Sequence, residues 1–249
     1  MDIIQITDLH ISKDINHKKH NCIPYHSLTD TLSAIRFNHN IENLIITGDL
    51  SSDYSLESYM HIKNLLAKYP FKITLLPGNH DDLNNMKMIL DKQISFQNID
   101  LSDLKILTYN FDTHIPGKIA GRLKTSDIKN LIQQLNNQEK INHVVIFAHH
   151  PIVPIGSKWI DKHICENSEL LIETLHSYKN LEFKIFCGHV HQDSYLKANN
   201  IEFYTTPSTC YQFKPYSDDF DIDESLSYGY RVISLHDTSI NSEVIRVIT

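Results

Sequence analysis

Short apolar runs that indicate buried strands recur along this chain, and helical patterns separate them. Residues 2–6, 44–47 and 72–76 are such runs, and residues 27–37 and 55–69 between them carry apolar side chains at helical spacing. A helix is the usual connection between neighbouring parallel strands. The alternation therefore predicts an α/β fold that is built on a parallel sheet.

The rest of the chain continues this pattern and then changes. Further strands are predicted over residues 104–111, 144–147 and 183–187, and further helices over residues 82–91, 125–135 and 167–178. Four short strand patterns follow, over residues 195–198, 201–206, 230–235 and 244–248. Residues 152–166 and the acidic stretch 216–227 are predicted to be loops, the second of them solvated.

Charge and cysteine content restrict the classes of function. The net charge of −7 argues against a surface for unspecific binding of nucleic acid. The four cysteines show no paired spacing, which favours a reducing cytosol over a disulfide framework. We find no signal-peptide pattern and no apolar run that is long enough to cross a membrane.

Side chains that can bind metals follow five of the predicted strands. They are Asp8 with His10, Asp49, Asn79 with His80, His149 with His150, and His189 with His191. The carboxyl ends of parallel strands lie along one edge of a sheet, so these side chains can converge. Imidazole and carboxylate together suit manganese, iron or zinc better than magnesium or calcium. No cysteine lies at these ends, which argues against a closed thiolate zinc site.

Each of these residues also has an ordinary structural explanation. Asp8 and Asp49 could cap turns, His149 and His150 could lie in a plain loop, and His189 and His191 could face opposite sides of a strand. The presence of such side chains at all five strand ends favours a metal site over five separate structural explanations. Two ions need about seven or eight ligand atoms, and the residues other than His80 and His150 can supply them. His80 is then free for another task.

The same residues resemble a known family. The motifs Asp8-Leu9-His10, Gly48-Asp49, Gly78-Asn79-His80-Asp81, His149-His150-Pro151 and Gly188-His189-Val190-His191 stand in the order of the calcineurin-like metallophosphoesterases, over nearly the whole chain. The resemblance implies a four-layer α/β/β/α sandwich with two mixed central sheets. It implies a single domain over residues 1–249, whose β-rich C-terminal part, about 194–249, completes the second sheet.

The resemblance also implies a dinuclear metal centre. By the family pattern, one ion is held by Asp8, His10, Asp49 and His191, and the other by Asp49, Asn79, His149 and His189, with Asp49 as the bridge. His149 is preferred to His150 because the family ligand ends its strand. Two divalent ions are expected, iron or manganese first and zinc or cobalt as alternatives.

Within the family the chain looks most like the bacterial class III 3′,5′-cyclic nucleotide phosphodiesterases that hydrolyse cyclic AMP, on residues 48–53, 156–163 and 206–213. This resemblance implies hydrolysis to 5′-AMP by in-line attack of a hydroxide that bridges the ions. His80 would act as general acid with help from Asp81 or another acid, Asn79 would orient a phosphate oxygen, and Gly78 would supply the turn between strand and site. Substrate contacts are expected from His10, Asn79, His80, His150, Trp159, His163 and Tyr211. One of Trp159, Tyr211 and Phe213 could stack on the base, although each taken singly is better explained as a loop anchor packed on the core.

Other functions on the same scaffold remain open at this stage. They are a broad phosphodiesterase, a 2′,3′-cyclic nucleotide hydrolase, a phosphomonoesterase and, more remotely, a metal-binding interaction scaffold without catalysis. The expected partner is a small cyclic nucleotide, with no nucleic acid or membrane, and the protein is expected to be a cytoplasmic monomer or homodimer.

Overall fold

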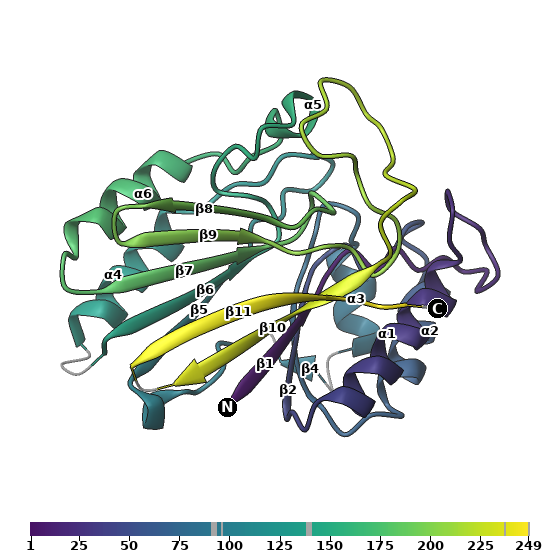
Figure 1. Cartoon of the computed structure of the whole chain (residues 1–249), viewed down its shortest axis with the longest axis horizontal. Coiled ribbons are helices and arrows are strands. Elements are labelled where there is room, and N and C mark those ends of the chain that lie inside the picture. The colour runs from purple at the N-terminus through teal and green to yellow at the C-terminus, as the bar shows by residue number, and fades with distance from the viewer. Residues whose placement is uncertain (91–93, 96, 138–140, 237, 249) are drawn as a thin grey trace.

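The computed structural model describes residues 1–90, 94–95, 97–137, 141–236 and 238–248, which form two mixed sheets with helices outside them (Figure 1). The first sheet has the order β11-β10-β1-β2-β3-β4 and comprises β1 (Asp2–Ile6), β2 (Asn43–Thr47), β3 (Lys72–Leu76), β4 (Ile94–Ser95), β10 (Gly229–His236) and β11 (Ser239–Arg246). The second has the order β5-β6-β7-β9-β8 and comprises β5 (Ile106–Phe111), β6 (His143–Ala148), β7 (Glu182–Cys187), β8 (Ser194–Ala198) and β9 (Ile201–Thr205). The predicted α/β class is confirmed.

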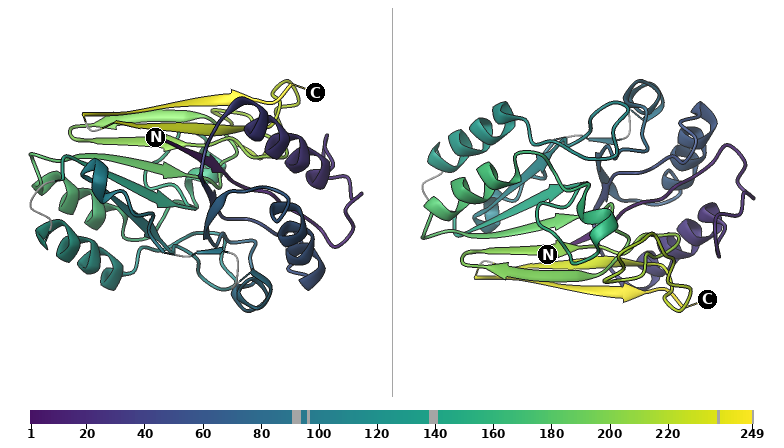
Figure 2. Two further views of the ribbon diagram at one scale, coloured as in Figure 1. Left: turned by 90° about the horizontal axis from the view of Figure 1, so that it is seen from below. Right: turned by 90° about the horizontal axis from the view of Figure 1, so that it is seen from above.

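The outer face of the first sheet is covered by α1 (Pro24–Asn38), α2 (Leu56–Leu66) and α3 (Leu83–Leu90), and that of the second by α4 (Thr125–Asn137) and α6 (Ser168–Ser177). The short α5 (Lys158–Asp161) lies among the loops beyond the strand ends, and a 3-10 turn, η1 (Ser102–Leu104), precedes β5. Figure 2 shows the purple and blue helices of the N-terminal part on one side and the teal and green helices α4 and α6 on the other, with the strands between. None of the described helices is long and apolar enough to cross a membrane.

Three apolar clusters occupy the spaces between these layers. The first sheet packs on α1, α2 and α3 through residues such as Ile4, Leu32 and Ile62, and the second packs on α4 and α6 through a separate cluster. A third cluster lies between the sheets and joins Ile45 of β2 to Phe147 of β6. Burial on both faces explains why the central strands are continuous apolar runs instead of alternating ones. The four-layer α/β/β/α architecture is confirmed.

Parallel pairing brings the functional strand ends level with one another. β1 pairs with β2 through Ile6 and Ile46, so the turns that follow both strands lie side by side. In the second sheet β6 pairs with β7 through Ala148 and Cys187, the residues just before His149 and Gly188. The register of each sheet therefore places its ligand-type residues at one edge.

The C-terminal part divides between the two sheets, which corrects the sequence prediction. β8 and β9 complete the second sheet as expected, and β9 lies parallel to β7. The hairpin of β10 and β11 instead joins the first sheet, where β10 pairs antiparallel with β1. The prediction that all of residues 194–249 complete the second sheet is therefore wrong. Strand patterns give the number of strands, but not the partner of each one.

Several element limits differ from the sequence predictions for local reasons. α1 begins at Pro24, three residues early, because proline suits the first turn of a helix. α2 begins after Ser55, whose side chain accepts a hydrogen bond from the Ser58 N–H. The predicted loop 152–166 contains the short helix α5. The predicted helix end at residue 91 lies outside the described residues.

Candidate metal centre

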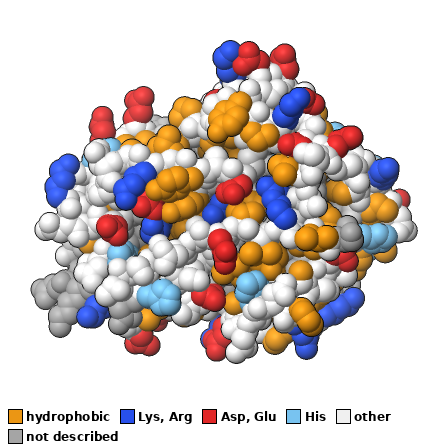
Figure 3. All heavy atoms as spheres, viewed as in Figure 1, with side chains coloured by type: hydrophobic (Ala, Val, Ile, Leu, Met, Phe, Trp, Pro, Cys, Tyr) orange, Lys and Arg blue, Asp and Glu red, His pale blue; other side chains and the backbone are white. Residues whose placement is uncertain are grey.

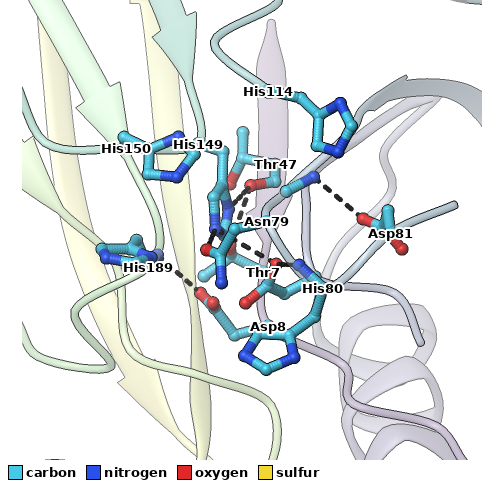
Figure 4. Close-up of polar contacts among 12 residues, drawn as sticks. Thr7, Asp8, Thr47, Asn79, His80, Asp81, His114, His149, His150 and His189 are labelled. Carbon is cyan, nitrogen blue, oxygen red and sulfur yellow. Dashed lines mark hydrogen bonds and ion pairs between the residues drawn. The ribbon is translucent and has the colours of Figure 1, made fainter. Parts of the chain in front are cut away.

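The predicted ligands converge where the carboxyl ends of the two sheets meet. Two contacts join the sheets at this point: the His149 Nδ1–H donates to the Thr47 carbonyl at 2.6 Å, and the His189 backbone N–H donates to Asp8 Oδ2 at 3.0 Å. Figure 4 shows Asp8, Asn79, His80, His149 and His189 gathered around this junction. The strand ends singled out in the sequence therefore build one site.

Five of the predicted ligands have a left-handed backbone. They are Asp8, His10, Asp49, His189 and His191, with φ between 47° and 67°. Such residues are uncommon, though aspartate and histidine tolerate the conformation better than most, and they gather at functional sites. In Asp8-Leu9-His10 and His189-Val190-His191 the middle residue is fully buried in an apolar cluster. The outer two side chains of each motif are thus free to face the site.

One group of ligating atoms comes from Asp8, His10 and His191. These atoms all lie within 4.8 Å of one another. His191 Nε2 is 3.1 Å from His10 Nε2 and 3.3 Å from Asp8 Oδ1. Two imidazoles and a carboxylate at these distances form an appropriate donor set for a transition-metal ion.

A second group surrounds His149. Its Nε2 is 3.3 Å from Asp49 Oδ1 and 3.2 Å from Asn79 Oδ1. The other carboxylate oxygen of Asp49 is 3.9 Å from His10 Nε2, so Asp49 faces both groups. This is the position that a bridging carboxylate needs.

Backbone carbonyls orient two of the histidines. The His149 Nδ1–H donates to the Thr47 carbonyl, and the His191 Nδ1–H donates to the Tyr211 carbonyl at 2.9 Å. A proton on Nδ1 leaves the Nε2 lone pair of each ring pointing toward the other predicted ligands, which together are called the cluster below. Hydrogen bonds of this kind are the usual support of metal-bound histidine.

Three buried atoms of the predicted ligands have no hydrogen-bond partner among the described residues. They are Asp8 Oδ1, His10 Nδ1 and His189 Nε2, and all three residues are at most 5% exposed. A buried carboxylate oxygen and an imidazole nitrogen left unpaired destabilise the fold unless a cation completes them. The donor set and these open atoms therefore fit divalent metal ions.

The pKa values of His10 and His189 agree with this donor set, whereas that of His149 opposes it. Burial lowers the pKa of His10 and His189 well below the usual value, which keeps both rings neutral and able to ligate. Burial has the same effect on His149, but the Asp49 and Asp8 carboxylates outweigh it and raise the pKa of His149 to about 9. An ion bound at His149 therefore competes with a proton.

His150 does not face the cluster with a free nitrogen. Its Nε2–H donates to the Ile119 carbonyl at 2.9 Å, and its Nδ1 accepts from Thr113 Oγ1 at 2.8 Å. The ring is fully buried. A ligating atom of His150 lies within 4.8 Å of those of His149 and His189, but both of its ring nitrogens are already engaged. The contacts therefore favour His149 as the ligand and do not support the expectation that His150 contacts substrate.

Asp81 supports the backbone and makes no hydrogen bond to the His80 ring among the described residues. Its carboxylate accepts hydrogen bonds from the backbone N–H groups of Leu50, Ser51 and Gly78 and from the Tyr59 hydroxyl, at 2.9–3.2 Å. These donors belong to the turn after β2, the turn after β3 and α2. Asp81 therefore joins the two turns that carry Asp49 and Asn79, and its expected help to His80 is not supported.

Glycines allow the turns to approach closely. A Cβ on Gly78 would lie 2.1 Å from Asp49 Oδ1 and 2.8 Å from His149 Cε1. Gly78 is not among the residues with a positive φ, so close contact and not turn geometry requires a glycine there. Gly188 is restricted in the same way, since a Cβ would lie 2.0 Å from Thr7 Oγ1. The expected role of Gly78 is corrected accordingly.

His80 stands at the rim of the cluster. Its ring is half-buried and packs edge-on against His10, with ring centroids 5.3 Å apart, and parallel to Tyr54 at 6.4 Å. Its backbone N–H donates to Asp49 Oδ1 at 2.8 Å. Burial lowers the pKa of His80. The structure thus leaves this imidazole next to the predicted ligands.

A cavity of about 220 Å³ lies directly over the cluster. Trp159 and His163 line it, and Trp159 packs edge-on against Phe213 and Phe220. Tyr211 also lines it but is buried under His10 and His191. That one of the aromatic residues stacks on a base stays a prediction.

Two further residues at the site were missed from the sequence. Lys19 is the one lysine or arginine among the described residues that line the cavity over the cluster, and it lies in a loop without periodicity, so no sequence signal marks it. His114 follows β5 by three residues, and its backbone N–H donates to Asp112 Oδ1 at 3.1 Å. The rule that polar residues follow parallel strands, applied to this sixth strand end, would have identified it.

Comparison with known proteins agrees with this description. The family model described as Calcineurin-like phosphoesterase matches residues 1–193. A probable cyclic nucleotide phosphodiesterase of Coxiella burnetii is 30% identical over 98% of this chain and 96% of its own length. The 3′,5′-cyclic adenosine monophosphate phosphodiesterase CpdA of Vibrio vulnificus is 32% identical over 94% of this chain and 85% of its own length.

Solved structures show the same fold at low identity. A dimetal phosphatase from Danio rerio superposes with a TM-score of 0.71 and 14% identity, covering 100% of this chain and 99% of that one. A purple acid phosphatase from Lupinus luteus gives a TM-score of 0.63 and 12% identity, covering 99% of this chain and 51% of that one. At these identities the similarity concerns the architecture alone.

Proposed function

Because this chain belongs to the calcineurin-like phosphoesterase family, a family of hydrolases, we propose that it hydrolyses 3′,5′-cyclic AMP to 5′-AMP with two divalent metal ions. The observation that carries the proposal is a complete set of ligand-type side chains with one imidazole, His80, left beside it. The choice of substrate is supported by relatives with about one third identity that are named cyclic AMP phosphodiesterases.

The two groups of side chains suggest the ligand assignment. One ion would be held by Asp8, His10, Asp49 and His191, and the other by Asp49, Asn79, His149 and His189. Asp49 would be shared by the two ions, since its two oxygens face the two groups. Iron and manganese suit these nitrogen and oxygen donors, and zinc or cobalt can replace them.

Residues of the chain itself take separate roles in the proposed hydrolysis. The chemistry that bound divalent ions supply is activation of water and withdrawal of charge from the phosphate oxygens. Asn79 orients the phosphate, and His80 donates a proton to the departing ribose oxygen. The negative phosphodiester beside His80 favours the protonated ring and so offsets the effect of burial. Lys19 attracts the anionic substrate to the mouth of the site.

The proposed partner is a small cyclic nucleotide in the cytoplasm, not nucleic acid or a membrane. The four cysteines are free thiols, as in a reducing compartment. Figure 3 shows lysine and arginine side chains dispersed among acidic ones over the face drawn, without a continuous basic stripe. The protein is proposed to act as a monomer or homodimer.

The test is a substrate panel on protein whose metal content is quantified. Cyclic AMP, cyclic GMP, a 2′,3′-cyclic nucleotide and p-nitrophenyl phosphate are compared by kcat/KM, and the products are identified by chromatography. The proposal expects cyclic AMP to be preferred and 5′-AMP to be the product. Activity on monoesters alone, or metal binding without hydrolysis of any of these compounds, would overturn it.

A further inference from the structure

A second cavity lies beyond His80, next to the one over the metal cluster. Its volume is about 540 Å³, within the range of small-molecule sites. Asn79, His80 and Ile119 line both cavities, so the two adjoin at these residues. The far wall is formed by residues 116–118 and by His114, from the loop that follows β5. None of the roles proposed above uses this cavity.

His114 is the unexplained polar group of this cavity. It is 8% exposed, and its Nδ1 has no hydrogen-bond partner among the described residues. A buried imidazole nitrogen without a partner is unfavourable unless something else completes it. Figure 4 shows His114 on a loop separate from the one that carries Asn79 and His80. Nδ1 is itself enclosed by the protein, so rotation of the ring is needed to present it to a ligand in the cavity that His114 lines.

The loop holds His114 in place. Its backbone N–H donates to Asp112, and the Asp112 carboxylate forms an ion pair with Lys124 at 2.8 Å. The hydroxyl of the neighbouring Thr113 donates a hydrogen bond to His150. The Thr113 carbonyl accepts a hydrogen bond of 2.9 Å from the backbone N–H of Arg122. A polar group that is fixed before binding recognises its ligand without an ordering penalty.

The rest of the lining suits a flat ring that carries polar groups at its edge. The half-exposed Tyr54 ring lies parallel to His80, and Pro116 and Ile119 supply apolar surface. Asn84 and Lys118 add polar groups, and Asp81 and Asp82 add acidic ones. Apolar and aromatic surface combined with polar groups is typical of small-molecule sites, and the two acidic residues disfavour a free phosphate.

We propose that this cavity binds the nucleoside part of the cyclic nucleotide and that His114 hydrogen-bonds to its ribose or base. The inference rests on the proposed function. If the phosphorus lies over the predicted metal ligands and the leaving oxygen lies at His80, the attached ribose extends past His80 into the second cavity. His114 is thus a specificity-determining residue and not a proton donor to the leaving group.

The first experiment compares a substrate that has a nucleoside with one that lacks it. For His114→Ala we expect kcat/KM for cyclic AMP to fall by about tenfold or more, mainly through KM. Hydrolysis of bis(p-nitrophenyl) phosphate should stay within about twofold of wild type. His114→Gln, which keeps a polar group, should recover part of the loss, and His236→Ala, at an exposed histidine outside both cavities, is the control. Equal losses on both substrates, or no loss on cyclic AMP, overturn the proposal.

The second experiment separates this inference from the proposed function. Binding of 5′-AMP to the full chain is measured by calorimetry for wild type, His114→Ala and Trp159→Ala. If wild type binds 5′-AMP, and His114→Ala weakens binding about tenfold, the subsite is supported even where cyclic AMP is not hydrolysed. If wild type binds no 5′-AMP, or only Trp159→Ala weakens binding, the nucleoside does not lie against His114 and the proposal is overturned.

Discussion

The carboxylate of Asp49 accepts a hydrogen bond of 2.8 Å from the backbone N–H of His80, so the proposed bridging ligand and the backbone of the proposed proton donor hold each other in position. The turn after β2 and the turn after β3 are joined at the point where the chemistry is proposed to occur. Changes on either side of this contact should therefore separate metal binding from proton transfer.

His80→Ala should retain metal and lose turnover. The ring is not needed to complete either group of ligating atoms, so we expect normal metal content with kcat lowered by about a hundredfold or more. Asp49→Ala should empty the site, because both groups lose a shared ligand. Metal analysis of the purified variants together with kcat checks both expectations. Loss of metal from His80→Ala would show that His80 is itself a ligand.

Gly78→Ala should disrupt the candidate metal centre although Gly78 is not itself a proposed metal ligand. The added Cβ would meet Asp49 Oδ1 at 2.1 Å and displace the bridging carboxylate. We expect lower metal content and a loss of about a hundredfold in turnover, which a displacement of this size can cause. Gly117→Asn is the control for metal content, because a Cβ there meets nothing within 4 Å and asparagine tolerates the positive φ. Normal metal content in Gly78→Ala would contradict this account.

Asp81→Asn should reduce stability and metal binding together. An amide cannot accept all the hydrogen bonds that the carboxylate accepts from Leu50, Ser51, Gly78 and Tyr59. We expect the free energy of unfolding to fall by about 2–3 kcal/mol, measured in urea. Tyr59→Phe, which removes one donor and leaves the carboxylate, should lose less. If Asp81→Asn keeps its stability and metal but shifts the pH–rate profile, Asp81 assists His80 after all.

Lys19→Gln should weaken binding of cyclic AMP and leave the chemical step unaffected. The ammonium group lies 5.4 Å from the centre of the Tyr211 ring in the wall of the cavity over the cluster. We expect KM to rise about fivefold at low salt and the difference to shrink as ionic strength rises. Lys18→Gln is the control, since Lys18 is exposed and outside that wall. A fall in kcat with unchanged KM would be inconsistent with substrate attraction.

Glu202→Gln should destabilise the protein at neutral pH and not at low pH. Burial opposes ionisation of Glu202, but hydrogen bonds from Lys184, Tyr204 and Lys197 lower its pKa from 4.5 to about 2. A lowered pKa means that ionised Glu202 stabilises the fold above pH 4.5 and that this contribution is lost as the pH falls toward 2. We expect a difference of about 2 kcal/mol in unfolding free energy at pH 7. Urea titrations across this range check it, with the exposed Glu243→Gln as control.

The alternation of strands and helices and the chemistry of the strand ends follow from the amino-acid order alone. Apolar runs such as residues 44–47 and 144–147 must be buried, and polar residues just after them must lie at the edge of a sheet. These statements depend on neighbours in the chain, so periodicity and composition are sufficient. The same rule extends to His114, which follows β5.

Strand pairing and the orientation of the side chains at the site depend on tertiary contacts. The β10–β11 hairpin joins β1, more than two hundred residues away in the chain, because pairing depends on packing between distant segments and not on strand pattern. His149 and His150 are neighbours in sequence, yet hydrogen bonds with Thr113 and Ile119 engage both ring nitrogens of His150. Left-handed φ values at Asp8 and His10 aim both side chains into one site. These orientations arise from contacts between segments that are far apart in the chain, and such contacts leave no local pattern in the sequence.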